Sequence, residues 1–221
     1  MKEKRGRSMK EIVILGAGDF GKEVAWLIEE INKRTPSYII LGYLDDDEKK
    51  IGTMINGYEC LGPISYLKEL NENHHACAVI ANQNVDIRRK FVDMFPDFSD
   101  WETLIHPSVN ISDTSKIGKG CVICASCNIS VNTVIGDFCL FNISVTMGHD
   151  CVVGDYVSIM SGSCVSGHVT IENGAYLATN CTVIPGMKVG EHARVGAGSV
   201  VLRNVKPGIT VMGVPAKVLH F

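Results

Sequence analysis

The sequence predicts two joined folds, an N-terminal α/β domain and a C-terminal parallel β-helix built from hexapeptide repeats. Strand-like and helix-like apolar patterns alternate through the first part of the chain. From Ile117 to Val201 every sixth residue is apolar, fifteen positions in a row. The charges divide in the same way, because residues 1–105 hold 32 of the 45 Asp, Glu, Lys and Arg residues. We therefore expect domains at residues 1–105 and 106–221.

The N-terminal domain is expected to begin with a buried strand at residues 11–15, which leads into a glycine-rich loop. Val24, Leu27, Ile28 and Ile31 follow at the spacing of one apolar helix face. Further strands are predicted at 38–44, 76–81 and 101–105, and further helices at 62–70 and 86–94. Strands that alternate with helices indicate a parallel, Rossmann-like sheet.

The loop Gly16-x-Gly18-x-x-Gly21 lies between the first strand and the first helix. Glycines there permit a tight turn and a close approach of phosphate to the helix N-terminus. The acidic run 45–47 follows the second strand, where a carboxylate can accept from a ribose hydroxyl or form an ordinary solvated turn. About 100 residues of α/β structure make half of a dinucleotide fold, so a mononucleotide site is favoured over a dehydrogenase.

The C-terminal domain repeats at two periods. Besides the apolar column, a column of small or aliphatic residues runs from Cys121 to Val205 at the same six-residue step. Ile117-Gly, Ile135-Gly and Val153-Gly recur at eighteen residues, so three hexads make one coil. Each coil then contributes three short parallel strands, and stacked coils satisfy one another's backbone groups about 4.8 Å apart.

The nine cysteines are an odd number, and most of them fall in the repeats. The spacing of Cys121, Cys124 and Cys127 is that of some metal sites. The repeat instead places Cys121 and Cys127 inside the coil on adjacent sides, so we expect fillers and no metal. Interior positions of the same class hold Cys139, Cys151 and Cys181.

Composition excludes several classes of protein. The net charge of −3 argues against a nucleic-acid partner. No apolar run is long enough for a membrane helix, and the run at residues 12–15 is too short for a signal peptide. We expect a cytoplasmic protein with reduced thiols.

Taken together, the pattern resembles the bacterial sugar acetyltransferases, which include sialic-acid O-acetyltransferases and N-acetyltransferases of nucleotide-linked 4-amino sugars. The resemblance rests on the α/β start, the His-Pro-Ser junction at 106–108, the sequence GHDCVVG at 148–154 and the ending GVPAK at 213–217. It implies a left-handed β-helix, a homotrimer, acetyl-CoA as the donor and no metal.

Acyl transfer needs a base, and histidine suits this role. His149 and His168 lie on the outward parts of their hexads, nineteen residues apart, hence on the same side of successive coils. Asp150 can accept from the His149 ring and hold its tautomer. The resemblance implies that His149 and Asp150 are the base and its partner, whereas a plain surface role is favoured for His168.

The resemblance also implies binding residues. Gly167 is expected to approach the thioester, where its N–H can polarise the carbonyl. Further acetyl-CoA contacts are implied at Ser158, Ala178, Thr179, Gly196 and Ala197. Contacts with the nucleotide of the acceptor are implied at Asp19, Phe20, Gly21, Asp45 and Asp46. The family often has Gly-His-Gly where this chain has Asp19-Phe20-Gly21.

The sequence thus predicts an acetyl-CoA-dependent N-acetyltransferase that acts on a nucleotide-linked amino sugar by direct attack, with His149 as general base. O-acetylation of sialic acid or another sugar hydroxyl uses the same residues and stays open. A non-catalytic nucleotide-sugar binding protein is a further alternative. A zinc carbonic anhydrase on this fold needs three converging histidines, and His149 and His168 have no third histidine nearby.

Overall fold

The computed structural model describes residues 9–219, and the chain divides into two compact units. The first unit holds residues up to 82 together with 91–102, and the second holds 83–90 together with 103 onward. Helix α3 (Val85–Met94) therefore begins in the second unit, although the predicted boundary lies after residue 105. No helix within residues 9–219 is long and apolar enough to cross a membrane.

The first unit is a five-stranded sheet with helices, in the strand order β3-β4-β2-β1-β5. Strands β1, β2, β4 and β5 are parallel, and only β3 is antiparallel to its neighbour β4. The strands are β1 (Lys10–Leu15), β2 (Tyr38–Leu44), β3 (Met54–Ile55), β4 (Tyr58–Gly62) and β5 (Cys77–Ile80), and the helices are α1 (Asp19–Arg34), the 3₁₀ helix η1 (Ile64–Tyr66) and α2 (Leu67–His74). The buried face of α1 contains Val24, Leu27 and Ile28, as its spacing predicts, while Ile31 at the end of this face is half-buried.

Two features of this unit differ from the sequence prediction. The β3–β4 hairpin was not predicted, although Asn56-Gly57 at its turn, with φ of 47° and 90°, is a strong hairpin signal. The strand predicted at 101–105 is divided between the units. Trp101 forms an isolated bridge with Ala78, whereas β6 (Leu104–Ile105) pairs with a strand of the β-helix.

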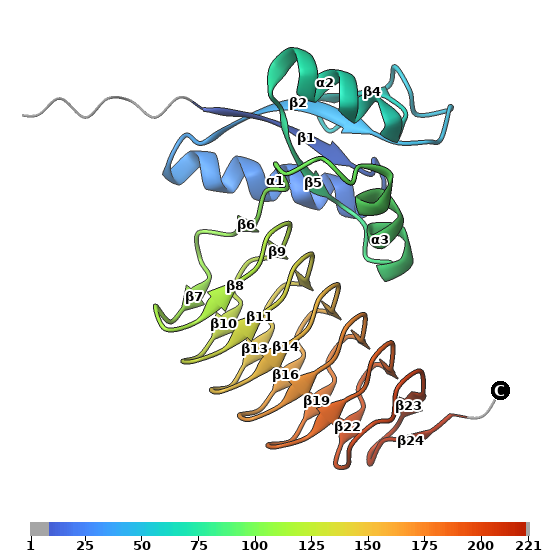
Figure 1. Ribbon diagram of the computed structural model, residues 1–221. Coiled ribbons are helices and arrows are strands. Elements are labelled where there is room, and N and C mark those ends of the chain that lie inside the picture. Colours follow the sequence, from blue (N-terminus) through green and yellow to red (C-terminus); the bar gives the residue numbers. More distant parts are fainter. Residues whose placement is uncertain (1–8, 220–221) are drawn as a thin grey trace, which may run out of the picture. The chain divides into compact units, whose positions relative to one another are not determined.

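The second unit is a parallel β-helix with three sheets (Figure 1). One sheet contains β7 (Asn110–Ile111), β10 (Asn128–Ile129), β13 (Thr146–Met147), β16 (Cys164–Val165), β19 (Thr182–Val183) and β22 (Val200–Val201). The second contains β8 (Lys116–Ile117), β11 (Val134–Ile135), β14 (Val152–Val153), β17 (Thr170–Ile171) and β20 (Lys188–Val189). The third contains β6, β9 (Val122–Ile123), β12 (Leu140–Phe141), β15 (Ser158–Ile159), β18 (Tyr176–Leu177), β21 (Arg194–Val195), β23 (Thr210–Met212) and the antiparallel β24 (Lys217–Val218).

The register of these ladders is eighteen residues from β6 to β22, so each side chain lies beside its equivalent one coil away. Ile129 pairs with Met147, and Met147 pairs with Val165. All three side chains are buried, as the six-residue column predicts. Small residues such as Ser163 fill the remaining interior space. The period thus determines which side chains face inward and which remain on the corners.

The last coil is two residues shorter, because Val195 pairs with Val211 and Val189 with Val205. Val205 therefore continues the apolar column and not the predicted column of small residues.

The five thiols predicted to lie inside the coils are all buried: Cys121, Cys127, Cys139, Cys151 and Cys181. Cys121 donates to the Gly136 carbonyl at 3.2 Å, and Cys127 donates to the Asn142 carbonyl at 3.1 Å. Cys164, in contrast, is exposed, while the other eight cysteines are buried. Buried thiols bonded to carbonyls are inert fillers.

We expect a thiol reagent to label one of the nine cysteines in the native protein, at Cys164. Burial raises the pKa of Cys77 to about 12 and that of Cys127 to about 11, so the reactive thiolate is scarce there. Mass spectrometry after native alkylation tests this. Cys164→Ser is expected to abolish native labelling, and rapid modification of any second cysteine would contradict the buried assignment.

Candidate active site

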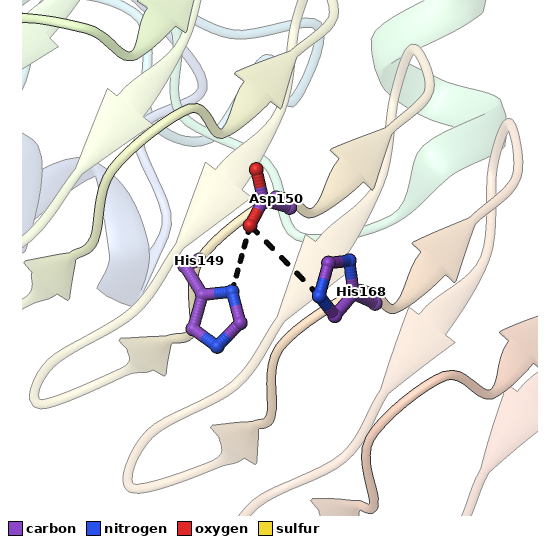
Figure 2. Close-up of side chains that lie close together, drawn as sticks. All are labelled: His149, Asp150 and His168. Atoms are coloured by element: carbon purple, nitrogen blue, oxygen red, sulfur yellow. Dashed lines mark hydrogen bonds and ion pairs between the residues drawn. The ribbon is translucent and has the colours of Figure 1, made fainter.

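His149 and Asp150 occupy the corner between β13 and β14. The His149 Nδ1–H donates to Asp150 Oδ2 at 2.8 Å (Figure 2). Asn132, one coil earlier, donates to the other carboxylate oxygen of Asp150 at 3.0 Å. The hydrogen bond from His149 and then that from Asn132 hold the pKa of Asp150 below its usual value. Asp150 is therefore an ionised acceptor for the Nδ1–H of His149, and in the neutral ring this tautomer places the lone pair on Nε2.

His168 lies one coil after Asp150, at the equivalent position eighteen residues on. Its Nε2 is 3.9 Å from Asp150 Oδ2, and its ring meets that of His149 edge-on, with 4.9 Å between centroids. Its backbone N–H donates to the His149 carbonyl at 2.9 Å. The side chains of His149, Asp150 and His168 are 53%, 40% and 65% exposed, so this cluster is open to a ligand.

Gly167 occupies the position directly equivalent to His149 on the next coil. A Cβ at Gly167 would lie 2.6 Å from His149 Nε2, so only glycine leaves room for the ring in this orientation. Within residues 9–219 the Gly167 N–H donates to no other group. The corner thus places a free backbone donor beside a histidine nitrogen that can accept a proton.

Four of the residues implied for acetyl-CoA form two stacked pairs at another edge of the β-helix. Ala178 and Thr179 follow β18, and Gly196 and Ala197 follow β21, eighteen residues later. Thr179 and Ala197 are exposed, and Ala178 and Gly196 are half-buried. This edge joins the β18 and β19 sheets, whereas the His149 corner joins the β13 and β14 sheets. One chain therefore carries the two sets on different edges.

Ser158 differs from that group because its side chain is fully buried. Its hydroxyl donates to the Gln83 carbonyl at 3.2 Å and accepts from Arg88 Nη2 at 2.9 Å. The implied acetyl-CoA contact of Ser158 is therefore not supported by its position. The residue instead holds the start of α3 against β15.

The glycine loop has the geometry expected of a phosphate site. Gly18 is the N-cap of α1, with no side-chain cap and no atom near the position of a Cβ. A Cβ on Gly21 would lie 2.2 Å from the Gly16 carbonyl oxygen, so Gly21 allows the helix to pack closely on the loop. Gly16 has a φ of 112°, which favours glycine. The helix N-terminus is thus free to accept an anion.

The acidic residues predicted beside this loop have internal partners. Asp45 Oδ2 accepts from the Ala17 N–H at 2.8 Å and from Lys50 Nζ at 2.9 Å. Burial raises the pKa of Asp45, but Lys50 and the backbone N–H groups of Asp47 and Ala17 outweigh it, so that the pKa is lowered. Asp46 is exposed, and its Oδ1 accepts from the Ile64 N–H at 3.0 Å. Asp45 therefore stabilises the loop through these hydrogen bonds, and its carboxylate oxygens already have partners within the protein.

The two residues at the start of α1 also differ from each other. Phe20 is buried, so its side chain packs in the α/β core and is unavailable as a nucleotide contact. Asp19 is exposed and pairs with Lys22 at 2.8 Å. That pairing offsets the negative charge at the helix N-terminus and lowers the pKa of Asp19, chiefly through the hydrogen bond.

Three contributors to these sites were not predicted: Asn132, Lys50 and Arg88. Asn132 lies eighteen residues before Asp150, which is the length of one coil. The repeat alone therefore predicts that the two side chains lie next to each other. Lys50 lies only five residues from Asp45, within the same turn. Arg88 carries no comparable signal, because its partners on the coils of the β-helix lie 50–70 residues away.

Comparison with known proteins agrees with this architecture. Residues 11–95 match the family described as the PglD N-terminal domain. GDP-perosamine N-acetyltransferase of Escherichia coli O157:H7 is 33% identical over 211 residues, 92% of this chain and 94% of the relative. PerB from Caulobacter crescentus, solved with CoA and GDP-perosamine, has a TM-score of 0.87 at 27% identity, covering 96% of this chain and 99% of PerB. The acetyltransferase domain of PglB from Neisseria gonorrhoeae FA1090, solved with acetyl coenzyme A, has a TM-score of 0.87 at 29% identity, covering 96% and 100%.

The fold and the exposed corner thus define an acetyltransferase with an α/β domain and a left-handed parallel β-helix. The chain belongs to the sugar acetyltransferase family that contains GDP-perosamine N-acetyltransferase. The predictions of this family, this fold class and an acyltransferase activity are confirmed.

We expect Gly167→Ala to lower acetyl transfer by at least about tenfold, because the new methyl group displaces the His149 ring. The melting temperature is expected to change little, since the side chain beside it is exposed. Steady-state kinetics and thermal melting of the same preparation check both points. Wild-type turnover in Gly167→Ala would show that the ring position beside Gly167 is not required.

Proposed function

We propose that this protein transfers the acetyl group of acetyl-CoA to the amino group of a nucleotide-linked amino sugar. The observation that carries the mechanism is the hydrogen bond between His149 and Asp150, which leaves the second ring nitrogen of His149 available. The substrate class is supported by the similarity, over nearly the whole chain, to an enzyme that N-acetylates GDP-perosamine.

The reaction proceeds in one ternary complex without an acyl-enzyme. His149 Nε2 takes a proton from the acceptor nitrogen as that nitrogen attacks the thioester carbonyl. Asp150 holds the opposite ring proton and stabilises the imidazolium that forms. The free N–H of Gly167 stabilises the developing oxyanion. The carbon–sulfur bond then breaks, and the leaving CoA thiolate takes the proton from His149 Nε2, which restores the neutral ring.

The α/β unit binds the nucleotide of the acceptor. Its phosphates receive hydrogen bonds from the N-terminus of α1 at Gly18 to Gly21, which is uncapped. Asp45 keeps this loop in shape through the Ala17 N–H, and exposed Asp46 is the acidic group that remains open to ribose or base.

A homotrimer is proposed because the two halves of the acetyl-transfer site lie on different edges of one β-helix. A neighbouring copy can bring the Thr179 and Ala197 edge of one chain to the His149 corner of another. Val134 and Val152, on adjacent strands after that corner, are 45% and 51% exposed and offer an apolar face for such packing. Light scattering is expected to give three times the 24.0-kDa chain mass.

The protein is proposed to act in the cytoplasm, because its nine cysteines are free thiols and a reducing compartment keeps thiols in this state.

The deciding experiment measures CoA release, by mass spectrometry, with GDP-, UDP- and dTDP-linked 4-amino sugars and with sialic acid. We expect turnover with a nucleotide-linked amino sugar and none with the matching sugar that bears a hydroxyl group. Turnover with sialic acid alone would replace this proposal by O-acetylation. Nucleotide-sugar binding without any turnover would favour the binding-protein alternative.

A further inference from the structure

The corner of the proposed active site brings together three groups that bind transition metals. His149 Nδ1, Asp150 Oδ2 and His168 Nε2 all lie within 4.8 Å of one another. Figure 2 shows both rings turned toward the Asp150 carboxylate, which lies between them. Two imidazoles and one carboxylate, with a fourth position open to solvent, are a donor set that suits Zn²⁺ and related ions.

The spacing of these atoms is close to that of a tetrahedral site. Metal–ligand bonds of about 2.0–2.2 Å place neighbouring ligand atoms roughly 3.4 Å apart. The observed separations from Asp150 Oδ2 are 2.8 Å to His149 and 3.9 Å to His168. The third pair, His149 Nδ1 and His168 Nε2, lies within 4.8 Å, and all three side chains are exposed, so rotation of the side chains can bring the separations toward this value.

The β-helix backbone holds the three ligands in place. Asp150 and His168 are equivalent positions on successive coils, and the His168 N–H is bonded to the His149 carbonyl. Asn132 occupies the oxygen of Asp150 that faces away from the rings, so the other oxygen is turned toward them. Such an outer partner orients a ligand carboxylate and supports its affinity for a metal.

We propose that His149, Asp150 and His168 bind a divalent transition-metal ion such as Zn²⁺, and that the bound ion inhibits acetyl transfer. The inhibitory part rests on the proposed function. To bind the ion, His149 Nδ1 must give up the proton that it donates to Asp150, so the single proton of the neutral ring then lies on Nε2. The nitrogen that would accept the proton of the acceptor amine then has no lone pair. The ion is an inhibitor, and the reaction itself uses none.

The binding test uses metal-free full-length protein and does not depend on activity. Calorimetry with Zn²⁺ and visible spectra with Co²⁺ are expected to show one ion per chain in the micromolar range, with the intense absorption of tetrahedral cobalt. His168→Gln is expected to weaken binding at least about tenfold. His192→Gln is the matched control, because His192 is also an exposed corner histidine and lies beside an acidic residue, Glu191. The backbone φ is positive at both histidines, 58° at His168 and 53° at His192. Equal affinities of wild type and His168→Gln, or no saturable binding by wild type, would overturn the site.

The inhibition test measures acetyl transfer against Zn²⁺ concentration, with each variant normalised to its own metal-free rate. We expect a half-inhibitory concentration at least about tenfold higher for His168→Gln than for wild type and His192→Gln, with recovery on chelation. Metal binding that leaves the rate unchanged would overturn the inhibitory part. If no acceptor is turned over at all, the proposed function fails, while calorimetry and spectra still decide the metal site.

Discussion

Replacing His149 with alanine is expected to lower kcat/KM for acetyl transfer by about 10²- to 10⁴-fold, the usual contribution of a general base. The loss should appear mainly in kcat, because the ring acts when the proton leaves the acceptor nitrogen. Folding should be preserved, since the side chain is 53% exposed and its hydrogen bond goes to the neighbouring Asp150. Steady-state kinetics with the acceptor found active gives the measurement.

His192→Ala provides the control for this experiment, because it removes an exposed histidine from another corner of the same β-helix. It is expected to retain wild-type kinetics. Full activity of His149→Ala would show that the acceptor amine loses its proton to another group, although the acetyltransferase class would stand.

Replacing Arg88 with methionine is expected to lower the free energy of unfolding by about 3 kcal/mol and the melting temperature by roughly 6–12 °C. The guanidinium is 2% exposed and donates to the carbonyls of Phe138 at 3.1 Å and Tyr156 at 2.7 Å. It also donates to the Gln83 carbonyl and the Ser158 hydroxyl. Burial lowers its pKa to about 10, so it is still charged at neutral pH. Methionine fills similar volume but leaves those acceptors without their donor.

Lys90→Met is the control, because it also replaces a basic residue of α3 with methionine, but at an exposed position. It is expected to change the free energy of unfolding by no more than about 0.5 kcal/mol. Differential scanning calorimetry of both variants gives the comparison. An Arg88→Met protein that melts with the wild type would show that water replaces the guanidinium at these carbonyls.

Burial in the β-helix was predictable from the sequence because its repeat is strict. A residue's place in the hexad determines whether it points inward, so the interior positions of Cys121, Cys127 and Cys139 follow from counting alone. The same counting places Asp150 next to His168, since the ladder register equals the coil length. The sequence period of the repeat therefore equals the register between paired strands, so one determines the other.

The α/β unit was less predictable, because its contacts depend on partners that no period relates. The helix face of α1 and the Gly21 packing followed from local spacing. The same local pattern could not show that Phe20 turns into the core. The local pattern also could not show that Asp45 accepts hydrogen bonds from Ala17 and Lys50, because these bonds form only in the folded loop.

For this protein, the sequence by itself determined the two fold types, the inward residues of each coil and the pairing of His149 with Asp150. Only the tertiary structure decided that Ser158 is covered by Arg88 and that His168 completes a three-ligand cluster. The physical reason is range. Periodicity constrains the direction of each side chain, whereas side-chain rotamers and partners 50 or more residues away are selected by packing in the folded chain.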